Sequence, residues 1–258
     1  MQHTDLSFMH ALADASAEAI LPLFRAGAGV HNKDTAGFDP VTDADRAAER
    51  AMRALIAERF PDDGVLGEEY GAANPGASRR WVLDPIDGTR AFIAGMPIWG
   101  TLIGLVEDGR PTLGMMNQPF TGERFWGAAS GSRWRRDGRE AALQTRRCDG
   151  LDAAVLVATT PDMFAAGEEA ETFERISRAA RLRRFGGDCY AYCLLAMGFV
   201  DVVMEANLKP YDILPLSPII EGAGGVVTGW DGGPPASSRV LASGDPRLHD
   251  AVLRLINR

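Results

Sequence analysis

The amino-acid sequence predicts a layered α/β protein, with α+β character in its first half. Three observations support this class: a run of antiparallel strand patterns before residue 147, alternating strand and helix patterns after it, and apolar residues at helical spacing near the N-terminus. The 258 residues can bury a large core. We expect one domain over 1–258, with approximate halves of 1–147 and 148–258, because the composition changes near residues 145–150.

Two helices open the first half. A helix over about 6–24 is predicted by apolar residues at helical spacing, namely Phe8, Leu12, Ala15, Ala19 and Leu23. Thr42 is expected to cap a second helix, with Asp45 at the third helical position, where the acid of a capping box sits. Pro61 ends this helix, and its expected buried stripe consists of Ala44, Ala48, Ala51, Leu55 and Ile56.

Antiparallel strands follow the two helices. Short apolar stretches at 65–67 and 81–83 each lead into acidic residues. Strand patterns at 99–106 and 111–116 flank an Asp-Gly turn, which is a strong hairpin signal. A second hairpin is predicted from 124–129 and 133–136. Its arginines are expected on a solvated edge rather than at a ligand site: Arg133, Arg135, Arg136 and Arg139.

The second half alternates between the two kinds of element, which is typical of a layered α/β half. Strands are predicted at about 153–158, 181–185, 202–206, 226–228 and 240–242. Helices are predicted at about 168–180, 189–199, 212–223 and 246–256, the third despite Pro215 and Pro218. The sequence contains no internal repeat and no low-complexity segment.

Composition limits the possible partners and the compartment. The net charge of −8 argues against nucleic acid or an anionic membrane as the main partner. No apolar run approaches the length of a membrane span, and the N-terminus shows no secretory signal. The three cysteines, Cys148, Cys189 and Cys193, lack metal-site spacing, so we expect reduced thiols in a cytoplasmic protein. Cys189 and Cys193 are four residues apart and should share one helix face.

The stretch from Trp81 to Thr89 is the strongest candidate for a functional site. It reads as the end of a buried strand followed by Asp84, Asp87, Gly88 and Thr89. The two carboxylates lie on a short arc stiffened by a proline, which suits Mg²⁺. Gly88 lets backbone N–H groups approach an anion, and Thr89 adds a hydroxyl. The alternative is an acidic turn whose carboxylates are solvated.

Other acidic residues can likewise be interpreted either as functional groups or as ordinary surface or helix-capping residues. Glu68 and Glu69 lie between two glycines. They are either a solvated surface pair or, if their segment lies next to the one that contains Asp84, Glu68 lies beside Asp84. Asp212 is expected at a helix N-terminus near the core, as a functional acid or as an N-cap. Glu205 ends a strand and is expected to face the same cleft. Asp45 is a first-turn helix residue in its simplest interpretation.

Several catalytic classes have no support in the sequence. The four histidines, His3, His10, His31 and His249, lie in no motif, which argues against His-ligated zinc and a phosphohistidine nucleophile. Gly-x-Ser-x-Gly, Walker A and Gly-x-Gly-x-x-Gly patterns are absent. Abundant acids without histidines favour Mg²⁺, or Mn²⁺ as a substitute, held by oxygen ligands.

Three blocks of the sequence resemble the signature of the inositol monophosphatase family. They are Gly67-Glu68-Glu69, Asp84-Pro85-Ile86-Asp87-Gly88-Thr89, and Tyr211-Asp212 followed by Glu221-Gly222-Ala223-Gly224-Gly225. The blocks occur in the family's order and roughly at its spacing, and the similarity covers essentially the whole chain. The resemblance implies an αβαβα sandwich of the inositol monophosphatase and fructose-1,6-bisphosphatase type, assembled as a homodimer.

The resemblance also implies the roles of individual residues. The catalytic Mg²⁺ ions would be held by Glu68, Asp84, the Ile86 carbonyl, Asp87 and Asp212, and Asp45 would reach a more weakly bound ion. Gly88 and Thr89 N–H groups would bind the phosphate, and Thr89 with Glu68 would orient and activate the attacking water. In this two-metal chemistry one ion acidifies the water and the other stabilises the leaving alkoxide, while both offset the repulsion between phosphate and carboxylates.

The substrate expected from the resemblance is a small phosphate monoester. The blocks at 186–190 and 207–212 look most similar to the histidinol-phosphatase branch, which implies histidinol phosphate and a place in histidine biosynthesis. A carboxylate at Asp188 or Glu205 would suit its ammonium and imidazole groups. Asp188 has the alternative role of a helix cap. The loop at 37–40 departs from the commonest family pattern, so Lys33 is not assigned a substrate role.

Other functions remain open at this point. The same chemistry would serve inositol-1-phosphate or a broad range of sugar phosphates. A 3′-phosphoadenosine nucleotidase would need a basic, aromatic nucleotide pocket, and the sequence offers only scattered arginines. A non-catalytic metal-binding regulatory protein would not need all five of the residues retained here: Glu68, Asp84, Asp87, Thr89 and Asp212.

Overall fold

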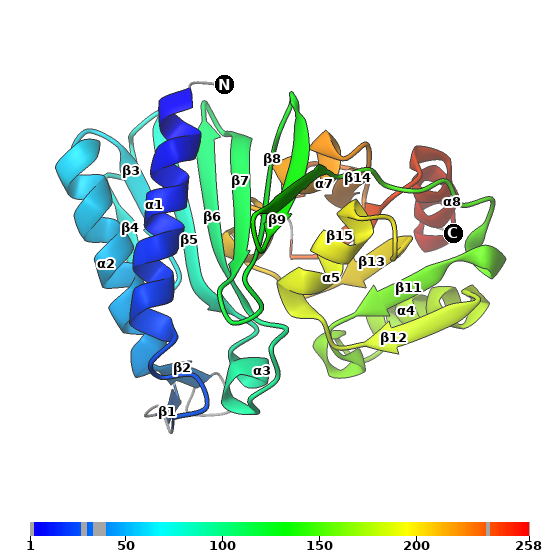
Figure 1. Cartoon of the computed structure of the whole chain (residues 1–258). Helices are drawn as coiled ribbons and strands as arrows, with labels where there is room; N and C mark the ends of the chain where they lie inside the picture. The colour runs from blue at the N-terminus through cyan, green and yellow to red at the C-terminus, as the bar shows by residue number, and fades with distance from the viewer. Residues whose placement is uncertain (1–2, 27–29, 33–39, 236–237, 258) are drawn as a thin grey trace.

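The layers of the fold alternate between helices and sheets (Figure 1). The structure, a computed structural model, describes residues 3–26, 30–32, 40–235 and 238–257. Helices α1 (His3–Ile20) and α2 (Asp43–Arg59) cover one face of a large sheet. Helices α5 (Asp188–Ala196) and α7 (Ser217–Gly222) lie between this sheet and a smaller one, and α4 (Glu168–Ala179) and α8 (Pro246–Ile256) form the last layer. The predicted αβαβα sandwich is therefore confirmed.

The large sheet has eight strands in the order β10-β9-β8-β7-β6-β5-β3-β4. All neighbouring strands are antiparallel except β3 and β5, which are parallel. Both predicted hairpins are present, as β6–β7 and β8–β9. The strands are β3 (Gly64–Gly67), β4 (Gly71–Ala73), β5 (Arg79–Asp87), β6 (Gly100–Glu107), β7 (Arg110–Gln118), β8 (Glu123–Ala128), β9 (Gly131–Arg136) and β10 (Arg139–Ala142).

The small sheet has five strands in the order β12-β11-β13-β15-β14. Its parallel core, β12-β11-β13, comes from the predicted strand–helix alternation, and β15 and β14 join it in antiparallel pairs. The strands are β11 (Val155–Ala158), β12 (Leu182–Phe185), β13 (Val202–Glu205), β14 (Val226–Gly229) and β15 (Val240–Ser243). A separate two-stranded sheet pairs β1 (Val30–Asn32) with β2 (Pro40–Thr42).

Alternating side chains of single strands supply neighbouring layers of the core. In β6, Leu102 packs among α5 and α7, whereas Ile103 and Leu105 pack against α1 and α2. In β13, Val203 faces the middle layer, and Val202 and Met204 face α4 and α8. This two-residue period is what a sheet covered on both faces requires.

Short elements complete the chain and include features that sequence patterns did not predict. They are α3 (Thr89–Ile93), α6 (Pro210–Ile213) and the 3₁₀ turns η1 (Leu151–Ala153) and η2 (Pro161–Met163). Among the described residues, no helix is long and apolar enough to cross a bilayer. Cys148, Cys189 and Cys193 are free and buried, and Cys189 and Cys193 share α5 as expected.

Two helix predictions were wrong in detail. The helix expected at 212–223 is broken into α6 and α7, because Pro215 and Pro218 each remove a backbone donor. The helix expected at 6–24 ends at Ile20. Its fully buried face includes Met9, Leu12, Ala13, Ser16 and Ile20, whereas Phe8, Ala15, Ala19 and Leu23 are only half-buried.

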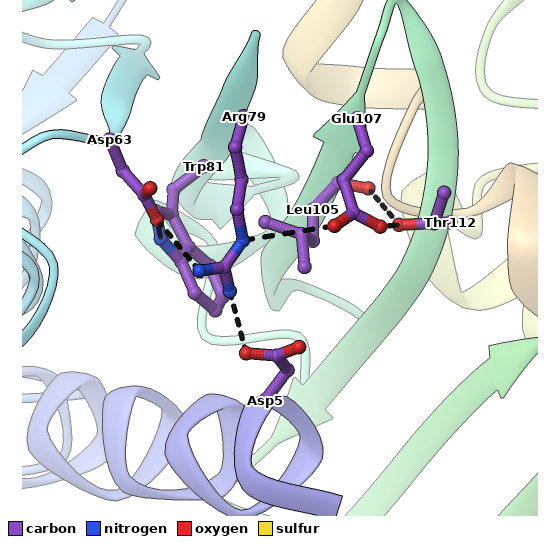
Figure 2. A network of polar contacts seen from close by, with 7 residues as sticks. All are labelled: Asp5, Asp63, Arg79, Trp81, Leu105, Glu107 and Thr112. Carbon is purple, nitrogen blue, oxygen red and sulfur yellow. Dashed lines mark hydrogen bonds and ion pairs between the residues drawn. The ribbon is translucent and has the colours of Figure 1, made fainter. Parts of the chain in front are cut away.

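An arginine ties the first helix to the start of β5 (Figure 2). Arg79 lies 2.6 Å from Asp5 of α1, 3.3 Å from Asp63 and 3.9 Å from Glu107 of β6. Trp81 Nε1 donates to Asp63 at 2.8 Å, so the same carboxylate serves both residues. The network joins α1, the segment before β3 and two strands at the end of the sheet remote from Asp87.

Glycines let the chain after α6 lie directly on the large sheet. Gly104, Gly114 and Gly127 are cross-strand partners on β6, β7 and β8. A Cβ on Gly114 would come within 1.9 Å of the Pro215 carbonyl oxygen, and one on Gly127 within 2.5 Å of Ile219 Cα. The close approach fixes the position of α6, which also contacts β5. It thereby joins the second half of the chain to the strand that carries Asp84 and Asp87.

We predict that Gly114→Ala lowers the free energy of unfolding by about 1–3 kcal/mol or more, because the added methyl group overpacks a backbone contact. The variant should also lose most activity, since the displaced segment leads back to Asp212. Urea unfolding and phosphate release measure both effects. Gly76→Ala is the control, because a Cβ there meets no atom within 4 Å. Wild-type stability in Gly114→Ala would show that the close approach is not a constraint.

Candidate metal centre and active site

Three carboxylates from distant parts of the chain meet at the end of β5. Asp84, Asp87 and Asp212 each place one oxygen within 4.8 Å of those of the other two. Along β5, Asp84 lies on the same face of the sheet as Val82, whereas Trp81 and Leu83 face α1 and α2. The pairing of β5 with β6 is irregular between Asp84 and Asp87, and this irregularity changes the two-residue alternation between the acids. Asp212 arrives from α6.

Glu68 joins this group through the parallel pairing of β3 with β5. Gly67 is the register partner of Leu83, and the Glu68 N–H donates to the Leu83 carbonyl at 3.1 Å. The side chains of Glu68 and Asp84 are close enough to hydrogen-bond. Of the two interpretations of Glu68, the structure supports the one that places it beside Asp84.

Asp45 combines a structural and a site-facing role. The predicted capping box is present: Asp45 Oδ2 accepts the Thr42 N–H at 2.8 Å, and Thr42 Oγ1 accepts the Asp45 N–H at 3.4 Å. The other oxygen, Oδ1, is buried without a hydrogen-bond partner among the described residues. Burial, together with the charges of Glu68 and Glu69, raises the pKa of Asp45 to about 7.

The carboxylates of this cluster are held in an environment that disfavours their charge. Burial first, and then the neighbouring acids Glu68, Asp87 and Asp212, raise the pKa of Asp84 well above its ordinary value. Burial likewise raises the pKa of Asp87, and that of Asp212 to about 7. Asp84 Oδ1 has no hydrogen-bond partner among the described residues. Buried, unpartnered hard oxygens from several acids fit a divalent cation.

The turn after Asp87 presents backbone and hydroxyl groups next to the cluster. Gly88 has φ 84°, a left-handed conformation that glycine adopts without strain, and it precedes the short helix α3. Thr89 Oγ1 donates to the Ile86 carbonyl at 3.1 Å. The Ile86 side chain is buried in the core, and its backbone carbonyl faces the Thr89 hydroxyl.

Asp188 is not the cap of α5, contrary to one of its two predicted roles. The N-cap residue is Gly187, and Asp87 Oδ2 accepts the Cys189 N–H at 2.6 Å. Asp188 itself has φ 44°, and its carboxyl lies 3.0–3.1 Å from the position of a Cβ on Gly88. Burial and the nearby Glu205 raise the pKa of Asp188 to about 7, whereas Arg90 opposes this shift. The left-handed backbone therefore directs this carboxyl over the Gly88 turn.

Glu205 lies deeper, at the end of β13. Its carboxylate accepts the Thr159 N–H at 2.9 Å, the Thr159 hydroxyl at 2.6 Å and the Tyr192 hydroxyl at 2.8 Å. Burial raises the pKa of Glu205 and outweighs these hydrogen bonds. As expected, Glu205 faces the cleft that contains the cluster, but protein donors already hold it.

Two cavities share residues at this site. The outer one has a volume of about 310 Å³ and is lined by residues that include Thr89, Arg90, Thr160, Asp188 and Asn207. The inner one, of about 90 Å³, is lined by residues that include Asp87, Tyr192, Glu205 and Asp212. Asp188 and Thr159 line both. Lys33 lies outside the described residues.

Sequence patterns missed Arg90, Thr159 and Thr160 as cavity residues. Thr159 and Thr160 follow β11 at the end nearest the site. Ligands of α/β proteins bind at the carboxyl ends of parallel strands. The position of both threonines directly after a predicted strand could therefore have indicated them. Asn207 lies in the block at 207–212 that resembles the family, but residue types alone did not predict its left-handed backbone, with φ 61°.

The fold places a carboxylate cluster that could hold a metal ion beside a cavity, an arrangement typical of metal-dependent phosphatases. A family model described as the inositol monophosphatase family matches residues 1–258. The chain belongs to the inositol monophosphatase family, whose members hydrolyse phosphoric monoesters with the help of a metal ion.

Relatives carry names from two substrate classes. The chain is 43% identical to the bifunctional phosphatase IMPL2 of Arabidopsis thaliana over 95% of this chain and 72% of the relative. It is 38% identical to a histidinol-phosphatase of Mycobacterium tuberculosis over 100% and 99%. Among solved structures, an inositol monophosphatase from Zymomonas mobilis is 43% identical, with a TM-score of 0.87 and coverage of 99% of this chain and 98% of that one.

We predict that the metal-free protein loses stability as the pH rises from about 4 to about 7. The aspartates titrate near 4 in an unfolded chain, whereas Asp45 and Asp212 titrate at about 7 in the folded one. The folded state therefore binds more protons in this interval, and its stability falls with rising pH. Urea unfolding in EDTA between pH 5 and pH 8 measures the trend.

Asp84→Asn should be more stable than the wild type in EDTA at pH 8, because it removes a buried carboxyl group whose ionisation burial and the neighbouring acids disfavour. Added Mg²⁺ should stabilise the wild type, by about 2.7 kcal/mol at one hundred times the Kd, and not the variant. The exposed Asp250 gives the control variant Asp250→Asn, which should behave as the wild type. A metal-free Asp84→Asn protein less stable than the wild type would contradict this account.

Proposed function

We propose that the chain is a Mg²⁺-dependent phosphomonoesterase that hydrolyses histidinol phosphate to histidinol and phosphate, a step of histidine biosynthesis. The observation that carries the proposal is the meeting of Asp84, Asp87 and Asp212 beside a cavity that contains a further carboxylate, Asp188. The first three acids suit a cation that binds phosphate. The fourth suits a cationic group on the alcohol that leaves.

The proposed metal ligands are Glu68, Asp84, the Ile86 carbonyl, Asp87 and Asp212, with Asp45 reaching a more weakly held ion. Their hard oxygens and lack of thiolates or imidazoles fit Mg²⁺, with Mn²⁺ as a substitute. When bound, the metal would acidify the attacking water and neutralise charge on the phosphoryl and leaving oxygens. Asp45 Oδ1 and Asp84 Oδ1, both buried and without a described partner, support this assignment.

Side chains and backbone groups of the Gly88 turn would handle the water and the phosphate. The Thr89 hydroxyl donates its hydrogen bond to the Ile86 carbonyl, so its oxygen lone pairs are left to accept a hydrogen bond from the attacking water. This bond orients the water toward phosphorus, and Glu68 takes the proton that the water releases. The N–H groups of Gly88 and Thr89 would bind phosphate oxygens, helped by the missing side chain at Gly88.

The histidinol part is assigned to the outer cavity. Asp188 would bind the ammonium group, because a carboxylate in a half-enclosed cavity forms a strong charge-assisted hydrogen bond with a cation. Glu205 adds negative potential behind it, although its oxygens already accept protein hydrogen bonds. Asn207 offers an amide for the imidazole.

An inositol-1-phosphate or broad sugar-phosphate phosphatase is the second candidate. The 43% identity to a solved inositol monophosphatase favours it, and a hydroxylated ring would also hydrogen-bond to Asp188 and Asn207. A non-catalytic metal-binding regulator has the least support, because the proposed general base Glu68 lies beside Asp84 and the proposed water-orienting Thr89 lies beside the Ile86 carbonyl.

We further propose that residues 1–258 form one domain, since the proposed ligands come from both halves of the chain. A cytoplasmic homodimer is the proposed assembly and location. The free, buried cysteines are consistent with a reducing compartment.

We predict a preference for histidinol phosphate over inositol-1-phosphate of at least about tenfold in kcat/KM. Asp188→Asn should lower kcat/KM for histidinol phosphate by about 10–100-fold, the worth of a charge-assisted hydrogen bond, and change p-nitrophenyl phosphate hydrolysis far less. Phosphate release with and without Mg²⁺ is the measurement, with Asp84→Asn as the inactive control. Equal turnover of the two natural esters would reject the histidinol assignment and leave the phosphatase assignment in place.

A further inference from the structure

A buried glutamate on α2 holds the segment that carries Glu68. The Glu49 side chain is fully buried, an unusual location for a carboxylate. Its Oε2 accepts the Glu69 N–H at 2.7 Å, and its Oε1 accepts the Tyr70 N–H at 3.2 Å. Both donors directly follow Glu68 in the chain, so Glu49 fixes the backbone at the point where that side chain leaves it.

Arg53 completes this contact from the next turn of α2. Its Nε donates to Glu49 Oε1 at 2.7 Å, and its Nη2 donates to the Gly71 carbonyl. The arginine offsets the charge of the buried carboxylate and holds the other end of the same segment. We call Glu49 and Arg53 the α2 clamp. Its contacts extend over residues 69–71.

Gly67 makes room for the α2 clamp. A Cβ at this position would lie 2.0 Å from Glu49 Oε1 and 2.4 Å from Glu49 Cδ. Any larger residue would have to displace the carboxylate from its two backbone donors. The glycine before Glu68 is therefore required by the close approach of Glu49.

Helix α2 carries a second acid on the same side. Asp45 and Glu49 are four residues apart and both are buried, so they occupy one face of the helix. Asp45 faces the charges of Glu68 and Glu69. One rigid helix thus positions two acids of the proposed metal centre, Asp45 directly and Glu68 through the α2 clamp.

We propose that Glu49 is a positioning residue that sets the Glu68 carboxylate for metal binding and catalysis. The inference rests on the proposed function, because it takes Glu68 as a metal ligand and general base. Glu49 would not contact the metal or the substrate. Its effect would pass through the Glu69 and Tyr70 amides to the neighbouring Glu68, as expected for a group that orients a metal ligand.

Glu49→Gln separates this role from simple structural support. The amide keeps the volume and one acceptor oxygen, but in either orientation its NH2 group faces a backbone N–H donor, so at least one of the two bonds to the Glu69 and Tyr70 amides is lost. We expect the Kd for Mg²⁺, measured by calorimetry on the metal-free protein, to rise by about 10–100-fold. At saturating Mg²⁺, kcat should fall by a similar factor, whereas KM should change by less than about threefold.

Asp201→Asn is the matched control. Asp201 is also a buried carboxylate that accepts a backbone N–H, from Val155 at 2.8 Å, and an arginine Nε, from Arg146 at 2.7 Å. It lies at the start of β13, whereas Glu205 reaches the cleft from the strand's other end. Both variants should lower the melting temperature, but Asp201→Asn should keep the wild-type Kd for Mg²⁺.

A double-mutant cycle tests the same contact from the other side. Gly67→Ala should raise the Kd for Mg²⁺ as Glu49→Gln does, because its methyl group occupies the place of the carboxylate. In a Glu49→Ala background the clash is absent, so adding Gly67→Ala should change the Kd by less than about twofold. This arm remains informative if Glu49→Gln does not fold.

The outcomes separate the inference from the proposed function. A wild-type protein that releases no phosphate from any monoester would reject the proposed function. An active wild type with a Glu49→Gln variant that binds Mg²⁺ as tightly as Asp201→Asn would reject only the positioning role. Additive effects of Gly67→Ala and Glu49→Ala on the Kd would reject it as well.

Discussion

The site depends on the contact between the chain after α6 and the glycines of the large sheet. Side chains at Gly104, Gly114 or Gly127 would push the segment from Pro215 to Ile219 away from the strands. Without that close approach, Asp212 would not lie beside Asp84, because they belong to different halves of the chain. The break between α6 and α7 also favours this contact, because Pro215 and Pro218 have no backbone N–H where the segment lies against Gly114 and Gly127. A packing constraint without catalytic residues thus assembles the carboxylate cluster.

The assembled cluster opposes folding in the absence of a cation. Burial and mutual repulsion raise the pKa values of Asp45, Asp84, Asp87 and Asp212, so forming the cluster at neutral pH costs stability. The Thr42 capping box holds Asp45, and the α2 clamp holds the segment of Glu68, close to the other carboxylates of the cluster, where burial and repulsion disfavour negative charge. This is the arrangement expected where function sets the geometry and the rest of the fold compensates. In the proposed function, the acidic chain would bind an anionic ester by way of the cation that these acids attract.

Local sequence signals predicted most elements and the site residues that follow strand ends. The Asp-Gly hairpin of β6 and β7 and the capping box of α2 both followed from short-range patterns, whereas the position of Glu68 beside Asp84 stayed one of two alternatives until the pairing of β3 with β5 was known. Roles set by distant contacts were not accessible in this way. The sequence is compatible with Asp188 as a helix cap, yet Asp87 from β5 accepts the backbone hydrogen bond at the start of α5 that a cap would take. Glu49 was missed because its donors lie 20 and 21 residues away.

The most direct test of this account is a crystal structure of the protein soaked with Mn²⁺, recorded with anomalous diffraction. The account predicts an anomalous peak within bonding distance of Asp84, Asp87 and Asp212, with Glu68 on the same ion or on a neighbouring one. Mn²⁺ bound only elsewhere, or an ion that contacts the acids of one half of the chain alone, would contradict it.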